Sequence, residues 1–181
     1  MPKHLRAFAP VLLAALTVAA VGAVTAGAAT PAGGAIHVLG TSNGLGTGGV
    51  IEVTGAIGDH GTTRTVNKAG KTDGNGAYVL LKLSQGTILL NKSKLDQAIN
   101  HAFGKASANQ ATCSIEVSGT GPVTFISGTG LYKGITGTAR ITVAIGFTFP
   151  RTASGKCNES NSATPTSSLQ LVSGDGSVHF G

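Results

Sequence analysis

The chain has few aromatic and few charged residues. Its 181 residues include no tryptophan and two tyrosines, and only 11% of them are Asp, Glu, Lys or Arg. A nucleic-acid interface clusters Lys and Arg beside stacking aromatic rings, whereas the cations of this chain are scattered along it. Glycosidase chemistry needs two carboxylates that face a sugar cleft, and this composition offers few aromatic platforms to hold the sugar. The composition therefore argues against both classes.

Motifs for common catalytic and metal-binding chemistry are also absent. The sequence has no G-x-S-x-G elbow, and its histidines follow neither His-x-His nor His-Glu-x-x-His spacing. Residues 44–49 have the spacing G-x-G-x-x-G, but a strand-like segment follows them. A dinucleotide-binding loop must open a helix instead. We therefore expect no metal and no cofactor.

The amino-terminal segment has the pattern of an export signal. Lys3 and Arg6 precede an apolar run over residues 7–28, which ends in Ala-Gly-Ala. We expect residues 1–28 to be a signal peptide that is cleaved near Ala28. The alternative is a retained membrane anchor, which Pro10 and the glycines of the run disfavour.

The rest of the chain has the length of one domain. We expect residues 29–34 to form a flexible amino-terminal segment, because they are rich in Ala, Gly and Pro. Residues 35–181 then form a single domain. The expected location is extracellular or associated with the cell envelope, with no membrane contact after cleavage.

Only two cysteines are present, Cys113 and Cys157, and both follow the predicted signal. An exported chain with an even number of cysteines usually oxidises them, so we expect one disulfide. A reactive thiol or a metal-binding pair is the alternative, but neither a nearby histidine nor a Cys-x-x-Cys spacing supports it.

Alternation of apolar and polar residues predicts antiparallel strands. It is clearest over residues 140–149, where Ile141, Val143 and Ile145 share one face and Arg140 and Thr142 share the other. Similar alternation marks Ile51, Val53 and Ile57, then Val79, Leu81 and Leu83, then Ile115 and Val117, then Val123 and Phe125, and finally Leu169 and Leu171. Short strands with glycine-rich connections indicate a barrel or a sandwich.

Two hairpin tips and one helix complete the prediction. Residues 73–76 (Asp-Gly-Asn-Gly) and 174–176 (Gly-Asp-Gly) separate apolar runs, which is typical of hairpin turns. Residues 92–103 carry apolar side chains at i, i+4 and i+8, with Ser93 as the expected cap and Gly104 as the end. We expect this helix to cover an end or a side of the β structure.

Glu52 and Glu116 are the most notable carboxylates, because each interrupts a strand-like run. Each should lie on the face opposite its apolar neighbours. If that face is solvated, both are surface residues; if it lines a cavity, they are acid or base candidates. For an enzyme, we would test Tyr78, Tyr132 and Arg140 with them.

The segment 127–137 resembles a turn of the dirigent proteins and of the related allene oxide cyclase-like barrels. The matching residues are Gly128, Thr129, Gly130, Tyr132, Gly134 and Gly137. Ser127 stands where dirigent proteins usually have a first glycine. The glycines allow a tight turn, and the aromatic ring packs back on the sheet. The resemblance covers residues 111–149.

This resemblance implies an eight-stranded antiparallel barrel, often trimeric, whose hydrophobic cavity holds a small apolar molecule. No catalytic residue of either family matches a position here, so no activity carries over. We expect an all-β barrel of about eight strands with one short helix, with a β-sandwich as the alternative. The expected function is extracellular binding of a small apolar ligand or a role in the envelope. The alternatives are an isomerase or cyclase with its site inside the barrel, or a purely structural secreted protein.

Overall fold

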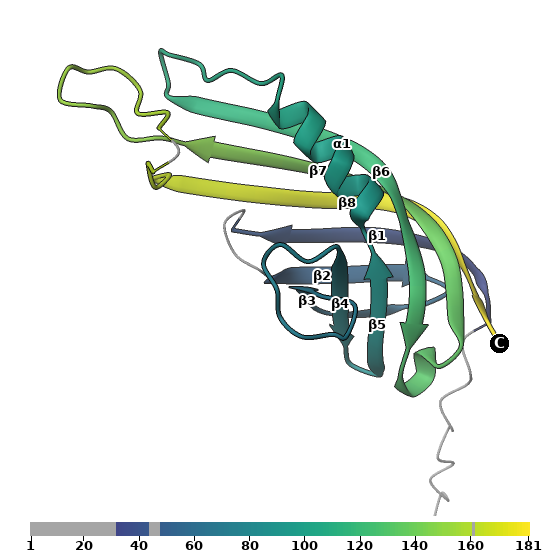
Figure 1. Ribbon diagram of the computed structural model, residues 1–181. Coiled ribbons are helices and arrows are strands. Elements are labelled where there is room, and N and C mark those ends of the chain that lie inside the picture. The colour runs from purple at the N-terminus through teal and green to yellow at the C-terminus, as the bar shows by residue number, and fades with distance from the viewer. Residues whose placement is uncertain (1–31, 44–47, 161) are drawn as a thin grey trace, which may run out of the picture.

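Eight antiparallel strands close into a barrel in the computed structural model (Figure 1), which describes residues 32–43, 48–160 and 162–181. Each strand pairs with the next in sequence, and the last pairs with the first. The barrel expected from the sequence is confirmed, and the sandwich alternative is wrong. The predicted signal peptide lies outside the described residues, as do residues 29–31 of the segment 29–34, and Gly34 of that segment is the first residue of β1.

The barrel strands differ greatly in length. They are β1 (Gly34–Ser42), β2 (Gly48–Gly55), β3 (Asp59–Val66), β4 (Tyr78–Leu83), β5 (Gly86–Asn91), β6 (Ser114–Gly128), β7 (Ile135–Thr148) and β8 (Ser167–Phe180). The last three run far past β4 and β5 (Figure 1). We call the part formed by residues 114–121, 141–148 and 167–174 the extension.

Helix α1 (Ser93–Phe103) lies across the inner face of the extension (Figure 1). Two glycines of β6 let it approach closely. A Cβ atom on Gly121 would lie 2.7 Å from the Cα of Leu95, and one on Gly119 would lie 2.9 Å from the Cα of Ile99. Leu95 is buried, so α1 covers one end of the barrel as the sequence predicts.

The opposite end of the barrel is filled by side chains. The glycine-rich segment after β6 forms the short turn η1 (Gly130–Tyr132), and Tyr132 folds back until only 1% of it is exposed. Ile36, Ile88 and Val178 are fully buried beside it in the core. We call this side-chain-filled end the closed end.

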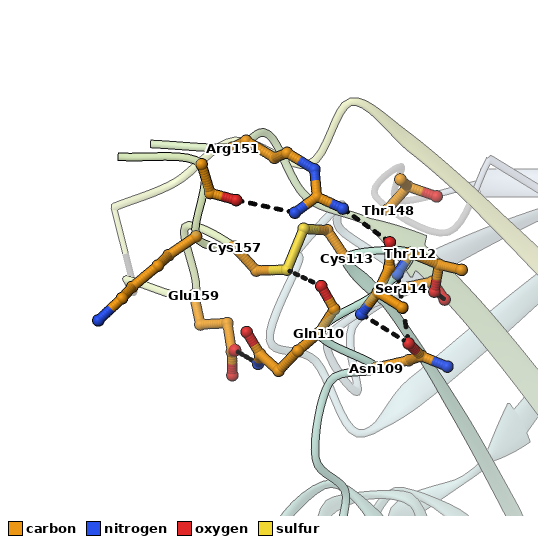
Figure 2. Close-up of a disulfide and its surroundings, with 12 residues drawn as sticks. Asn109, Gln110, Thr112, Cys113, Ser114, Thr148, Arg151, Cys157 and Glu159 are labelled. Atoms are coloured by element: carbon orange, nitrogen blue, oxygen red, sulfur yellow. Dashed lines mark hydrogen bonds between the residues drawn. A yellow bond between two sulfur atoms is a disulfide. The ribbon is translucent and has the colours of Figure 1, made fainter. Parts of the chain in front are cut away.

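A disulfide between Cys113 and Cys157 ties the loop after β7 to the start of β6 (Figure 2). Arg151 supports the same link, because its guanidinium donates to the carbonyl oxygens of Ala111 at 2.7 Å and Gly155 at 2.8 Å. The predicted disulfide is therefore confirmed, at the end of the extension farthest from the closed end.

Two local predictions are wrong. Residues 174–176 form no hairpin tip, because they lie inside β8. A Cβ atom on Gly174 would lie 2.2 Å from the carbonyl oxygen of Arg140, so this glycine permits a close approach between strands. Ser93 does not cap α1 but is its first residue, and Asn91 Oδ1 accepts hydrogen bonds from the Ser93 amide and hydroxyl.

Other predicted segments fall close to their expected places. Residues 73–76 lie in the loop between β3 and β4, where the Asn75 amide donates to Asp73 Oδ1. Ile57 lies in the turn between β2 and β3 and is buried. Leu169 and Leu171 belong to β8, but they point outwards and are each 53% exposed.

Candidate functional site: the barrel cavity

The barrel encloses a cavity of about 300 Å³ between its closed end and α1. Alternation along the strands turns one side chain in two toward this space. Its wall is mostly apolar and includes Val38, Ile51, Val53, Leu81, Leu90, Phe125, Ile141 and Val143. The volume is at the lower limit of small-molecule sites in proteins.

Strand β3 contributes the polar part of the wall. Thr63 and Thr65 lie two residues apart on the inner face of β3, and both are half-buried and line the cavity. Within the described part of the chain, neither hydroxyl takes part in a hydrogen bond. Both hydroxyls are therefore available to a molecule in the cavity.

The rim of the cavity beside α1 carries one ion pair. Lys92 Nζ lies 2.6 Å from Asp96 Oδ2 and 2.8 Å from Asp96 Oδ1, and the side chains are 18% and 33% exposed. These two are the only charged residues among the described residues that line the cavity. Because each neutralises the other, the lining has no net charge.

Two further polar side chains meet near this rim. Ser42, the last residue of β1, donates its hydroxyl to Gln170 Oε1 of β8 at 3.1 Å. Both residues line the cavity. The polar groups therefore gather at the rim and on β3, while the rest of the lining is apolar.

A second polar cluster lies at the closed end and does not line the cavity. Asp59 is buried and accepts hydrogen bonds from the hydroxyls of Tyr132 and Ser84 and from the amides of His60, Ser84 and Gln85. Burial alone would raise the pKa of the Asp59 carboxyl, but these hydrogen bonds outweigh it and hold the pKa well below its usual range. Burial and the neighbouring carboxylate raise the pKa of Tyr132.

Hydrogen bonds of this cluster join the connections at the closed end, in addition to the packing of its side chains. Asp59 begins β3, Ser84 and Gln85 form the turn between β4 and β5, and Tyr132 ends η1. One carboxylate thus links three connections that are far apart in sequence, and no buried side-chain polar atom of the described residues is left without a partner. We assign the cluster a structural role.

The structure does not bring the five sequence candidates together. Glu52, Glu116 and Arg140 are exposed on the outer face of β2, β6 and β7. Tyr78 is half-buried at the start of β4, and Tyr132 lies in the closed end. None of the five is among the described residues that line the cavity.

The sequence patterns do not identify the polar residues that line the cavity. Thr63 and Thr65 alternate with exposed residues, but threonine carries no apolar signal for an inner face. Lys92 and Asp96 have the i, i+4 spacing of a helical ion pair, which could have identified them.

The outer face of the barrel carries its own apolar side chains. Leu39, Val50, Leu169 and Leu171 are all more than half exposed, on β1, β2 and β8. The homo-oligomer implied by the family resemblance stays a prediction.

Neither a metal centre nor a spanning helix is present in the described ranges. No group of three or more His, Cys, Asp or Glu side chains there is placed to hold a metal ion. No helix among the same residues is long and apolar enough to cross a membrane.

Comparisons with protein-family models, with curated proteins and with solved structures return no match to this chain. The dirigent-like resemblance therefore depends on the sequence of residues 111–149 alone.

Proposed function

We propose that the protein binds a small, uncharged and predominantly apolar molecule inside the barrel. The apolar cavity of about 300 Å³ carries this proposal. A charged ligand would lose its hydration there without gaining a free counter-ion, because Lys92 and Asp96 already neutralise each other. An uncharged apolar ligand gains the free energy of leaving water at no such cost.

We propose binding without catalysis as the role of this cavity. The carboxylates and the arginine that could serve as acid or base lie on the outer face. General acid or base catalysis requires such a group within hydrogen-bond reach of the reacting atom. Among the described residues, Lys92 and Asp96 are the only two ionisable side chains at the cavity, and they are paired with each other.

A fluorescence titration with N-phenyl-1-naphthylamine, an uncharged apolar dye, tests the proposal. The dye should bind the wild-type protein and gain fluorescence. Val172→Phe fills part of the cavity and should weaken binding about 10-fold or more. Ser173→Phe is the matched control, because Ser173 is exposed on the outer face of the same strand.

Two results would contradict the proposal. Failure of the dye to bind the wild-type protein would show that the cavity does not accept apolar molecules. Equal binding by Val172→Phe and the wild type would place the dye elsewhere on the protein.

We also propose that the protein works outside the cytosol. The Cys113–Cys157 disulfide supports this, because such bonds persist in oxidising compartments. The pattern of residues 1–28 supports it independently. Intact-mass analysis of the protein recovered from its native compartment should show loss of residues 1–28 and two hydrogens fewer than the reduced chain. Full-length protein with free thiols would contradict the proposal.

A further inference from the structure

We propose that the ligand of the cavity carries one uncharged hydrogen-bonding group, a hydroxyl or a carbonyl, which binds Thr63 and Thr65 of β3. This inference depends on the proposed function and specifies the chemical class of the ligand. It derives from the uneven distribution of polar atoms around the cavity wall.

The two threonines are placed to act together. They lie two residues apart on one face of β3, so their Cα atoms are about 7 Å apart along the strand. Both line the cavity, and neither hydroxyl has a hydrogen-bond partner among the described residues. A hydroxyl both donates and accepts, so the pair can hold either a carbonyl or a hydroxyl group.

The wall facing β3 differs in chemistry. In the closed order of eight strands, β7 lies opposite β3. β7 presents Ile141, Val143 and Ile145 to the cavity, and all three are buried. A molecule that is apolar on one side and carries one polar group on the other would therefore satisfy both walls.

Apart from Thr41, which is exposed on β1, the other polar side chains of the lining already have partners. Ser42 donates to Gln170, and Lys92 pairs with Asp96. A ligand group bound at the rim would have to displace one of these contacts. The hydroxyls of β3 require no such exchange, so they are the preferred partners of the ligand.

A matched pair of fluorescent probes, naphthalene and 2-naphthol, tests the inference. The two differ by one hydroxyl group. The double variant Thr63→Val and Thr65→Val preserves the shape of the wall while removing both hydroxyls. We expect 2-naphthol to bind this variant roughly 5- to 10-fold more weakly than it binds the wild type. Naphthalene should bind both proteins with similar affinity.

Two further variants serve as controls. The double variant Thr63→Ser and Thr65→Ser keeps both hydroxyls and should keep the preference for 2-naphthol. Thr62→Val lies on the exposed face of β3 and should change neither affinity.

The outcomes separate this inference from the proposed function. Naphthalene binding to the wild type tests the cavity itself, and its absence would overturn both. If 2-naphthol binds wild type and valine variant equally, the threonines do not hold the ligand and only the inference fails. Loss of both probes by the valine variant would assign the hydroxyls to structure and would also overturn the inference.

Discussion

Asp59 is a buried carboxylate whose hydration shell is replaced by five hydrogen bonds from the protein. Four of the five donor groups belong to connections between strands, and the fifth is the His60 amide of β3. The side chain therefore fixes the positions of turns that the sheet alone would leave independent. At the scale of single residues, it is the principal polar determinant of the closed end.

Asp59→Asn should be strongly destabilising. The Asn amide nitrogen cannot accept the hydrogen bonds that one carboxylate oxygen now accepts, so buried donors lose their partner. We expect the free energy of unfolding to fall by roughly 2–4 kcal/mol, measured by urea denaturation. Asp73→Asn is the control, because Asp73 lies in the loop between β3 and β4. A similar small effect of both substitutions would contradict the structural role of Asp59.

The shifted pKa of Tyr132 predicts a loss of stability in alkali. Its pKa is raised in the folded protein above the ordinary value of about 10, so folding favours the neutral phenol. The contribution of Tyr132 to the free energy of unfolding is fully present below the pKa of the unfolded state and is lost as pH rises toward the pKa of the folded state. The free energy of unfolding should therefore decrease above about pH 10, and decrease less in Tyr132→Phe. Parallel pH curves for the two proteins would show that Tyr132 does not cause the loss.

The pKa of Asp59 predicts the opposite pH dependence. Because the pKa of Asp59 is lowered in the folded protein, its contribution to the free energy of unfolding is present above the unfolded pKa of about 3.9. This contribution is lost as pH falls below that value.

Among the elements, β7 and β3 differ in how well the sequence predicts them. The sequence predicts β7, because the inner face of this strand carries Ile141, Val143 and Ile145, so apolar and polar residues alternate cleanly. The sequence does not predict β3, because the inner face of that strand carries Gly61, Thr63 and Thr65. Both faces line the same cavity, but only the inner face of β7 is apolar. Alternation of apolar and polar residues therefore detects an inner face only where that face carries apolar side chains.

The same limit explains the candidate site. Glu52 and Glu116 are candidates by their chemical type, and alternation correctly places them opposite their apolar neighbours. Which face encloses the cavity depends on how the sheet closes, and no local pattern encodes this closure. Thr63 and Thr65 can be identified as cavity residues only from the closed barrel.

The contact between α1 and β6 can be tested with a single methyl group. Gly121→Ala would place a Cβ atom 2.7 Å from the Cα of Leu95, so the helix must move away from the strand. We expect a loss of about 1–3 kcal/mol in the free energy of unfolding, with weaker dye binding as the cover of the cavity shifts. Gly146→Ala on neighbouring β7 has open space around its Cβ and should be nearly neutral. Equal effects would show that close helix packing is not required.

At the scale of the whole molecule, the barrel divides into a packed half and a hollow half. Ile36, Ile88 and Val178 fill the closed end, and the cavity lies between them and α1. Among the described residues no second sheet packs against the extension, so its stability depends on α1 and on the disulfide.

Removal of the disulfide should destabilise the protein without opening the closed end. The bond joins residues 44 positions apart, and the chain-entropy model values such a link at roughly 3–4 kcal/mol. The double variant Cys113→Ser and Cys157→Ser should lose about this much by urea denaturation. Hydrogen exchange should increase in the extension more than at Asp59 and Tyr132. Uniform exchange throughout the barrel would contradict this division.

The proposed function requires that the space between β3, β7 and α1 receive an apolar molecule. Crystals of the protein grown with 2-bromonaphthalene test it directly, because anomalous scattering locates the bromine without ambiguity. We predict one bromine site inside the barrel, within contact distance of Val143 and Val172. Bromine found only on the outer face, or an interior that stays closed to the compound, would contradict the claim.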